Sequence, residues 1–357
     1  MVTLIIPCGG KSTRFKNTRP KYLLTYPDGE IMVKKAISGL DLNYFDRIIV
    51  TIVSDHVKEF QSDTILKQAF SIGSNSKVEL CILTNFTRCQ SETVYETIKK
   101  MSVDDSIVIK DSDNYFELKQ FPMGNFISGI DIKTSDREIN RLSAKSFLIV
   151  NEKGIITDII EKEIKSEFIC VGMYGFESSL DFCKAYESIS KNSDWTKCSE
   201  IYISHVISYM IGTRKYVFMY APVANYEDWG TMDDWHLIQL EKQTYFLDYD
   251  GVIVKNVGKY GISNWENSNE IIEENIKAIK EKYDRGAQIV VTTSRSNCYK
   301  EEIIKIFESR GIKLHAVITE CNHSSRIIIN DFAPSNPYPS CRAISIPRNG
   351  NLKDYLN

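Results

Sequence analysis

The chain has 357 residues, more than most single domains, so we expect two domains with separate hydrophobic cores. Hydrophobic residues make up 43% of it and charged residues 25%, values that exclude a disordered, collagen-like or coiled-coil protein. The formal net charge is -3 and no long run of Lys or Arg occurs, so we expect no nucleic-acid partner.

The sequence also argues against secretion and membrane insertion, and we expect a cytoplasmic location. An apolar run, Val2–Pro7, opens the chain without the basic region and cleavage site of a secretory signal. No stretch approaches the roughly 20 apolar residues that span a bilayer. Nine cysteines occur without a C-x-x-C pair, so we expect reduced thiols and assign no role to any of them, Cys8 and Cys170 included.

Short Ile- and Val-rich runs in the first two thirds of the chain predict β-strands. These runs are TLIIP, DRIIVTIV, KVELCIL, SIVIK and KSFLIV. Segments with helical spacing, such as residues 32–40, separate them. The alternation predicts an α/β fold in which helices flank a Rossmann-like sheet that is mixed but mostly parallel.

A second series of strands and helices begins at Gln243 and predicts a smaller α/β domain. Its four predicted strands are TYFLDYD, AQIVVTTS, AVIT and RIIIND, and the first of its two predicted helices covers about residues 269–283. Residues 235–242 have the composition of the last helix of the first domain. We therefore predict a boundary near Lys242, with domains at 1–242 and 243–357.

A glycine-rich turn follows the first predicted strand, in the segment LIIPCGGKSTRF. Such a turn lets backbone N–H groups approach phosphate oxygens, and basic side chains add charge. Its spacing matches neither a P-loop nor the full dinucleotide fingerprint, and alone it is equally typical of a turn without a ligand. The candidate phosphate-binding residues are Gly9, Gly10, Lys11, Ser12, Thr13 and Arg14.

Two aspartates follow the predicted strand SIVIK, in the segment SIVIKDSDNYF. We expect Asp111 and Asp113 at the carboxyl end of that strand, where open α/β sheets bind ligands. Carboxylates at this position suit Mg²⁺, which prefers a few hard oxygen ligands together with substrate phosphates. A solvated turn is the alternative interpretation of an isolated Asp-x-Asp.

The segments GGKSTRF and RPKYLL together resemble the signature of sugar-phosphate nucleotidyltransferases, a Gly-rich stretch ending in Arg-Phe and followed by Pro-Lys and an apolar pair. The chain departs from it with Gly-Gly in place of the common Ala-Gly, and with Lys and Ser in place of small residues. The resemblance implies that Arg14 and Lys21 act on the reacting phosphates. It also implies that Asp113, with Asp111 as the second candidate, holds Mg²⁺.

Three further segments extend this resemblance over roughly residues 1–240. The stretch YEDWGTMDDW is similar to the family's closing Asp-x-Gly-Thr stretch, which implies that Asp228 supplies the second metal carboxylate. The stretch IIEK, followed by CVGMYGF, resembles the segments that position the sugar phosphate and nominates Glu161 and Lys162. The run CSEIYISHVISYMI resembles a helix that begins with an acidic residue, here Glu200, a candidate substrate ligand.

The reaction implied by this resemblance brings two polyanions together. A phosphate oxygen of the acceptor attacks the α-phosphorus of a nucleoside triphosphate, and pyrophosphate leaves. Mg²⁺ on Asp113 and Asp228 would neutralise and orient the α-phosphate, while Arg14 and Lys21 would stabilise charge on the transferring phosphoryl and the leaving group. No general base is needed, because a phosphate is already ionised at neutral pH.

The start of the second series, Asp-Tyr-Asp-Gly after the apolar strand at 245–247, resembles the opening motif of haloacid-dehalogenase-like phosphatases. In that family the first Asp forms an aspartyl phosphate and the second is a general acid and base. The resemblance assigns these roles to Asp248 and Asp250, which would also hold Mg²⁺. A plain turn is the alternative interpretation of a lone Asp-x-Asp-Gly.

Later segments follow the order of this phosphatase family and also resemble small phosphatase-like proteins encoded with capsule genes. IVVTTSR offers Thr293 as the hydroxyl that binds phosphate, and RIIINDFAP offers Asp331 as a metal ligand. Arg326 or Lys300 would be the basic residue of the site. Asn330 precedes Asp331 where the family tends to place a second acid.

The leading hypothesis is a bifunctional enzyme that joins a nucleotide from a nucleoside triphosphate, CTP favoured, to a sugar or alditol phosphate for capsular or surface polysaccharide. CTP is favoured because the fused arrangement resembles capsule-locus enzymes, not because of any base-contacting residue. A second hypothesis is uridylyl or guanylyl transfer to a hexose 1-phosphate. A third is a non-catalytic binding or scaffold protein with degenerate domains. The oligomeric state is open, and a homo-oligomer is among the options.

Overall fold

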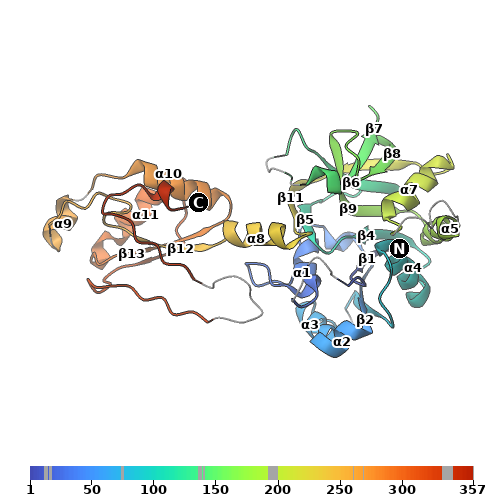
Figure 1. Cartoon of the computed structure of the whole chain (residues 1–357), viewed down its shortest axis with the longest axis horizontal. Helices are drawn as coiled ribbons and strands as arrows, with labels where there is room; N and C mark the ends of the chain where they lie inside the picture. Colours follow the sequence, from blue (N-terminus) through green and yellow to red (C-terminus); the bar gives the residue numbers. More distant parts are fainter. Residues whose placement is uncertain are drawn as a thin grey trace. The chain divides into compact units, whose positions relative to one another are not determined.

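The computed structural model describes residues 1–11, 15, 18–73, 76–135, 139, 141–191, 200–259, 261–267, 269–331 and 341–356. The chain divides into two compact units, Met1–Trp235 and His236–Asn357 (Figure 1). Helix α8, Met232–Glu241, contains this division and coincides with the helix predicted for residues 235–242. The domain boundary near Lys242 stays a prediction.

A nine-stranded sheet forms the centre of the N-terminal unit, and its strands alternate with helices along the chain. Its spatial order is β3 (Val78–Leu83), β2 (Arg47–Val53), β1 (Val2–Pro7), β4 (Ser106–Lys110), β9 (Phe168–Phe176), β6 (Asn125–Asp131), β10 (Phe218–Pro222), β8 (Ile155–Glu161) and β7 (Ser146–Val150). The first four are parallel, whereas β9 pairs antiparallel with β4 and β6. The α/β fold with a mixed sheet is therefore confirmed.

The expectation of a mostly parallel sheet holds for the strands up to β4, whereas beyond them β6 and β10 are parallel and the other pairs are antiparallel. Beyond β4 the chain makes tight reversals, such as the turn between β7 and β8 in which the N–H of Gly154 donates to the carbonyl of Asn151. Two strands joined by so short a connection must pair antiparallel, because a parallel neighbour needs a long crossover.

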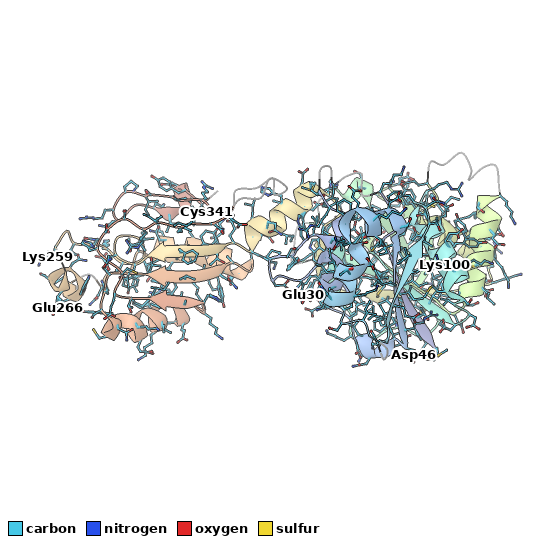
Figure 2. The ribbon with its side chains drawn as sticks, turned by 90° about the horizontal axis from the view of Figure 1, so that it is seen from below. Glu30, Asp46, Lys100, Lys259, Glu266 and Cys341 are labelled. Carbon is cyan, nitrogen blue, oxygen red and sulfur yellow. The ribbon has the colours of Figure 1, made fainter. Side chains whose placement is uncertain are left out.

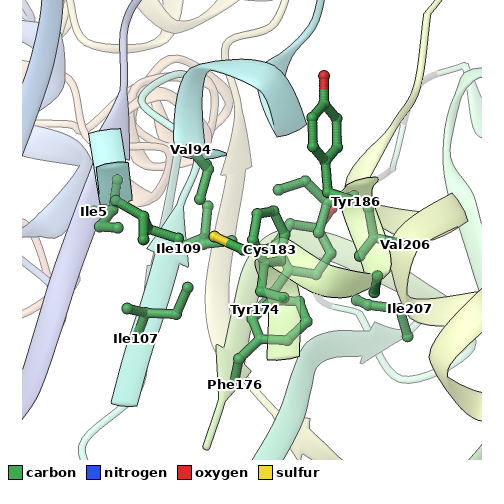
Figure 3. Close-up of a cluster of buried hydrophobic side chains, with 14 of the residues drawn as sticks. Ile5, Val94, Ile107, Ile109, Tyr174, Phe176, Cys183, Tyr186, Val206 and Ile207 are labelled. Carbon is green, nitrogen blue, oxygen red and sulfur yellow. The ribbon is translucent and has the colours of Figure 1, made fainter. Parts of the chain in front are cut away.

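Helices cover both faces of this sheet. One face carries α4 (Gln90–Met101), α5 (Ser179–Ser190) and α7 (Ile203–Gly212), and the other carries α1 (Met32–Ile37), α2 (Ser54–Phe60) and α3 (Ser62–Ala69). Side chains alternate along β1, so that Ile5 lies in the first core and Leu4 and Ile6 in the second. Figure 3 shows the first core, where Val94 and Val206 pack with strand residues.

A separate two-stranded sheet joins distant parts of the N-terminal unit. Its strands, β5 (Asn114–Glu117) and β11 (Ala224–Asp228), are antiparallel, and Asp228 lies opposite Asn114. The described short 3-10 helices are η1 (Lys21–Leu23), η2 (Leu42–Tyr44), η3 (Leu142–Ala144), η4 (Asn297–Tyr299) and η5 (Leu352–Asp354). The β5–β11 sheet is important for the site because it begins directly after the turn that carries Asp113.

The C-terminal unit is a smaller α/β structure with a core of its own. Its parallel sheet has the order β12 (Thr244–Asp248), β13 (Gln288–Thr292) and β14 (Ala316–Ile318), and its helices are α9 (Ile262–Asn267), α10 (Glu273–Asp284) and α11 (Lys300–Glu308). Its core includes Leu247, Ile289 and Phe307. Charged side chains such as Lys259 and Glu266 lie on its surface (Figure 2). No helix in the described part of the chain is long and apolar enough to cross a membrane.

The predicted fourth strand of this unit, RIIIND, is wrong. Among the described residues the sheet has three strands, and residues 326–331 form no ladder with it. Ile327 is 81% exposed and Ile329 92% exposed, so most of the apolar run that predicts a buried strand is open to solvent here. An apolar run becomes a strand only when a neighbouring edge and a core receive it. The unit also has a third helix, α9, that the sequence pattern did not predict.

Candidate active sites

Asp113 and Lys21 meet at the carboxyl end of β4. The Lys21 ammonium lies 2.5 Å from Asp113 Oδ2, although the two residues come from different ends of the first half of the unit. Lys21 opens η1, whose other residues Tyr22 and Leu23 are buried and so fix the position of the lysine. The structure therefore brings together the predicted phosphate-binding lysine and the predicted metal carboxylate.

Asp228 reaches the same place through the β5–β11 sheet. The backbone N–H of Trp229 donates to the carbonyl of Asp113 at 2.9 Å, and Asp228 is in register with Asn114. The two predicted metal carboxylates are thus held on adjacent backbone segments. Asp113 and Asp228 are far apart in the sequence, and only the pairing of β5 with β11 brings their backbone segments together.

Lys145 is a site residue that the sequence analysis missed. Its ammonium pairs with the carboxylate of Asp228 and lies 3.2 Å from the hydroxyl of Tyr226. Arg141 stands 4.0 Å from the same carboxylate and pairs with Asp234. These cations place positive charge beside Asp228, as Lys21 does beside Asp113, so the site combines two carboxylates with several basic groups. A single Lys before a predicted strand belongs to no motif, so nothing in the sequence indicates its place in the site.

Asp111 is hydrogen-bonded within the protein through both its backbone and its side chain. Its N–H donates to the carbonyl of Gly172 at 2.8 Å, and its carboxylate accepts a hydrogen bond from the side-chain amide of Gln90. Gly172 has φ of 79°, and a Cβ on it would stand 2.2 Å from Asp111 Oδ2. Burial, and secondarily the charge of Asp113, raise the pKa of Asp111 to about 6.

Lys110, the last residue of β4, is also absent from the sequence predictions. It is fully buried, and its ammonium donates to the carbonyls of Asp111 and Asn114 and to the side-chain oxygen of Asn114. Burial lowers the pKa of Lys110 to about 8, while the neighbouring carboxylates of Asp111 and Asp113 act in the opposite direction. In the sequence, Lys110 is only the single polar residue at the end of the run SIVIK, and nothing there indicates that it is buried.

Glu161 and Lys162, predicted to position the sugar phosphate, lie beside Lys145 at the ends of β8 and β7. The N–H of Lys162 donates to the carbonyl of Lys145 at 3.0 Å, which links the predicted pair to the partner of Asp228. Glu161 Oε2 accepts hydrogen bonds from Ser146 at 2.5 Å and Ser204 at 2.6 Å. The serines hold this carboxylate against the start of α7.

Lys162 and Glu200 meet at Tyr202, which directly precedes α7. The ammonium of Lys162 donates to the Tyr202 hydroxyl at 2.5 Å and lies 4.1 Å from the centre of its ring. Burial raises the pKa of Tyr202, and a hydrogen bond with Glu200 acts in the same direction. Lys162 has φ of 57°, a left-handed conformation that is uncommon for a non-glycine residue. The structure therefore groups the three predicted residues Glu161, Lys162 and Glu200 around the start of one helix.

The glycine-rich turn is described only in part. Gly9 is buried, and a Cβ on it would stand 2.9 Å from Thr93 of α4, so glycine lets the turn approach this helix closely. Lys11 is exposed, and its ammonium lies 5.7 Å from the ring centre of Phe86. Gly10 is exposed with open space around it. The other predicted residues of the turn, Ser12, Thr13 and Arg14, lie outside the described residues.

The carboxylates of the N-terminal unit fit a magnesium ion. Within the described ranges no group of three or more His, Cys, Asp and Glu side chains could hold a metal. Mg²⁺ does not require such a group, because it commonly binds through one or two carboxylates, waters and substrate phosphates. Asp113 and Asp228 supply two hard oxygen donors on paired backbone segments, which is the kind of donor set this ion uses.

In the C-terminal unit, Asp248 ends β12 and Thr293 follows the end of β13. Arg326 Nη2 lies 3.2 Å from Asp248 Oδ1, so the predicted basic residue and the predicted nucleophile meet. Burial raises the pKa of Asp248, and the charge of Arg326 opposes that shift. The Thr293 hydroxyl lies 3.5 Å from Asp250 Oδ2. Four of the residues predicted for the phosphatase site therefore gather at one end of the sheet.

Arg295, which the sequence analysis left without a role, is the main partner of Asp250. Its guanidinium is 1% exposed and contacts both carboxylate oxygens, with Nη2 2.7 Å from Oδ1 and Nε 3.1 Å from Oδ2. The guanidinium carbon also lies 4.8 Å from the ring centre of Tyr249 and 5.3 Å from that of Tyr299. A bidentate pair held between rings fixes the orientation of Asp250.

The remaining predicted residues of this unit, Asp331 and Lys300, lie outside the ends of β12 and β13. Asp331 is exposed at the end of the segment 326–331, which forms no strand, and its N–H donates to the side-chain oxygen of Asn330. Lys300 begins α11. The loss of the predicted fourth strand therefore leaves Asp331 outside the sheet that positions Asp248.

The α/β fold of the chain is shared with solved nucleotidyltransferases. A nucleoside-diphosphate-sugar pyrophosphorylase from Vibrio cholerae RC9 matches with a TM-score of 0.55 and 20% identity, over 66% of this chain and 98% of that one. The inositol-1-phosphate CTP transferase from T. maritima matches at 0.51 and 12%, over 67% and 94%. A UDP-glucose pyrophosphorylase complexed with UDP-glucose matches at 0.51 and 11%, over 67% and 97%.

These likenesses show a common fold over about two thirds of the chain, which is the share that the N-terminal unit makes up. No protein-family model and no curated protein matches the sequence. The activity must therefore be argued from the site itself.

Proposed function

We propose that the N-terminal unit is a nucleotidyltransferase that joins the nucleotide of a nucleoside triphosphate to a sugar or alditol phosphate and releases pyrophosphate. The observation that carries the proposal is the convergence of Asp113, Asp228, Lys21 and Lys145 at one end of a sheet. The fold that this unit shares with two proteins named as pyrophosphorylases and one named as a CTP transferase supports it.

In this proposal Asp113 and Asp228 hold Mg²⁺, which when bound supplies charge neutralisation at the phosphates. Lys21 contributes a cation beside Asp113 that contacts the transferring phosphoryl group or the leaving pyrophosphate. Lys145 has the corresponding position beside Asp228. Together these residues lower the repulsion between two polyanions that must approach in line.

The acceptor phosphate is expected near the start of α7, where Lys162 and the carboxylates of Glu161 and Glu200 lie together. A lysine can bind the phosphate, and the carboxylates can accept hydrogen bonds from hydroxyl groups of a sugar or alditol. The attacking oxygen belongs to an ionised phosphate, so the reaction requires no base from the protein.

CTP is the favoured triphosphate, and synthesis of capsular or surface polysaccharide is the favoured role. The name of one structural neighbour, an inositol-1-phosphate CTP transferase, supports cytidylyl transfer. The name of another, a UDP-glucose pyrophosphorylase, supports the alternative of uridylyl transfer to a hexose 1-phosphate. Both alternatives place the same carboxylates and lysines in the same roles.

The test is pyrophosphate release by the full chain with Mg²⁺, each of CTP, UTP and GTP, and a panel of sugar and alditol phosphates. Highest release with CTP and an alditol or sugar phosphate supports the proposal. Highest release with UTP or GTP and a hexose 1-phosphate supports the alternative. The Asp113→Asn protein is the matched control for contaminating activity. Release at the control level with every pair would favour a non-catalytic binding protein and contradict the proposal.

A second candidate function, phosphate-ester hydrolysis, concerns the C-terminal unit. The convergence of Asp248, Asp250, Thr293 and Arg326 favours it. Asp248 would attack phosphorus and displace the alcohol of the ester to form an aspartyl phosphate, which water then hydrolyses to inorganic phosphate and the free carboxylate. Phosphate release from sugar phosphates, bisphosphates and nucleotides tests this function, with Asp248→Asn as the control. No difference between the two proteins across that panel would make the unit a structural one.

A further inference from the structure

Lys110 is a buried cation whose hydrogen-bonding capacity is used within one short turn. An ammonium group has three N–H donors, and Lys110 directs its nitrogen to three acceptors of residues 111–114. The distances are 2.9 Å to the carbonyl of Asp111, 3.1 Å to the carbonyl of Asn114 and 2.5 Å to the side-chain oxygen of Asn114. The ammonium also lies 4.5 Å from the ring centre of Phe116. The residue is 0% exposed.

A charge in this position is costly unless it is fully paired. Leaving the turn would strip Lys110 of all three acceptors inside the protein, so the turn and the lysine stabilise one conformation together. A turn between two strands can form from polar residues and backbone hydrogen bonds alone, without a buried lysine. The buried lysine therefore specifies the shape of this turn.

The same turn carries one carboxylate of the pair and is joined to the strand that carries the other. Asp113 lies within it and meets Lys21, and its carbonyl accepts the N–H of Trp229 at 2.9 Å. Asn114, which gives Lys110 two of its acceptors, is the register partner of Asp228. A shift of the turn would move Asp113 directly and would move Asp228 through the β5–β11 ladder.

We propose that Lys110 is a positioning residue for the Asp113–Asp228 pair, acting through the backbone of residues 111–114. Lys110 contacts neither the substrate nor the carboxylate oxygens in this role. Its function depends on the nucleotidyl transfer proposed above, because that reaction needs the two carboxylates at a defined separation. The effect of Lys110 on the shape of the turn, in contrast, does not depend on any reaction.

The test compares Lys110→Met, which keeps the length and volume of the side chain, with the wild type and with Lys119→Met. Lys119 is the matched control because it is exposed and donates to a single carbonyl, that of Gly39. The first readout is hydrogen exchange at the Trp229 amide, measured against the amide of Ile5 in the centre of the sheet. We expect exchange at Trp229 to rise at least about tenfold in Lys110→Met with little change at Ile5, and neither to change in Lys119→Met.

The second readout is the Mg²⁺ concentration that gives half-maximal pyrophosphate release. We expect Lys110→Met to raise it and to lower kcat, with KM for the triphosphate at saturating Mg²⁺ nearly unchanged. Equal acceleration of exchange at Trp229 and Ile5 would mean that the lysine only stabilises the unit, and would overturn the proposal. Unchanged exchange at Trp229 would overturn it as well.

Asn114→Ala provides a second route if Lys110→Met does not fold, because it removes one acceptor and leaves the lysine in place. It should give the same selective exchange at Trp229 to a smaller degree, and equal exchange throughout would again overturn the proposal. Should wild-type protein release no pyrophosphate from any triphosphate, the proposed function would fail, while the exchange ratio would still decide whether Lys110 holds the turn.

Discussion

Each of the two proposed metal carboxylates contacts a lysine, and the two lysines come from separate segments. Lys21 reaches Asp113 from η1, and Lys145 reaches Asp228 from the residue before β7. A carboxylate that is paired with a lysine is held in a fixed orientation in the free protein, before a polyanionic substrate binds. Loss of the carboxylate charge should therefore disturb the site far more than the fold.

Asp113→Asn and Asp228→Asn should each lower pyrophosphate release by roughly 10²-fold or more, because an amide is a much poorer ligand for Mg²⁺ than a carboxylate. Circular dichroism should show a folded protein in both cases. Asp104→Asn, which changes an exposed aspartate, is the matched control and should keep full activity. A wild-type rate in either variant would remove that residue from the metal site.

We expect His56 to give the N-terminal unit a pH-dependent stability. It is 5% exposed, its Nδ1 lies 3.2 Å from the hydroxyl of Tyr22, and burial lowers its pKa below the ordinary value of 6.5. Below about pH 6.5 the unfolded chain binds a proton at His56 that the folded chain does not bind, so protonation favours unfolding. The contribution of His56 to stability is complete above that pH and decreases as the pH falls toward the folded pKa.

We therefore expect the free energy of unfolding in urea to decrease between pH 7.5 and pH 5.5, and to decrease less in His56→Gln. The amide keeps a hydrogen-bonding group near Tyr22 and does not titrate. His315→Gln is the control, since the change in a residue of the C-terminal unit should leave this part of the pH dependence as it is. An identical pH profile in wild type and His56→Gln would contradict the assignment.

At the scale of elements, β9 lies antiparallel beside β4, whose carboxyl end carries the candidate carboxylates. Gly172 in β9 combines a φ of 79° with contact to the Asp111 carboxylate, so both backbone conformation and space require glycine there. This glycine explains how an antiparallel strand can pack closely beside a strand that is followed directly by an acidic residue, Asp111.

Gly172→Ala should lower the free energy of unfolding by about 2 kcal/mol or more, since left-handed backbone and overpacking each cost about 1 kcal/mol or more. Gly212→Ala is the matched control, because Gly212 ends α7, is exposed and has no atom within 4 Å of a Cβ position. It should be neutral or slightly stabilising. Urea unfolding measures both, and equal effects of the two changes would show that space around residue 172 is not limiting.

At the scale of the whole molecule, the two units have separate cores and separate candidate sites. The buried clusters of the N-terminal unit contain no residue of the C-terminal sheet, and the carboxylates of the two sites come from different units. Chemistry at one site should therefore not require the side chains of the other.

Asp248→Asn should leave pyrophosphate release within about twofold of wild type while it removes any phosphate release, because the amide cannot readily form an acyl phosphate. Both activities are measured on the same preparation, with the thermal unfolding temperature as the control for folding. Impaired pyrophosphate release at an unchanged unfolding temperature would show that the two sites work as one coupled unit.

The strands and the α/β class could be predicted from the sequence, because both depend on local periodicity. The runs that contain β1, β2, β3, β4 and β7 are short and apolar, and a buried strand requires that composition wherever it lies in the sheet. Asp113 could be nominated as well from its position after a strand-like run, and Asp228 from the resemblance of YEDWGTMDDW to the nucleotidyltransferase motif. The sequence by itself thus determined the class of fold and a set of candidate residues.

Only the tertiary structure decided how these parts meet. The pairing of β5 with β11 brings Asp113 next to Asp228, and the positions of Lys145 and Arg295 depend on partners far away in the chain. The sequence does not reveal whether a charged side chain is solvated or paired in the interior, because burial is a property of the packed fold. For the same reason the apolar run at 326–331 predicted a strand that the structure does not contain: a strand forms only where a partner edge and a core receive it.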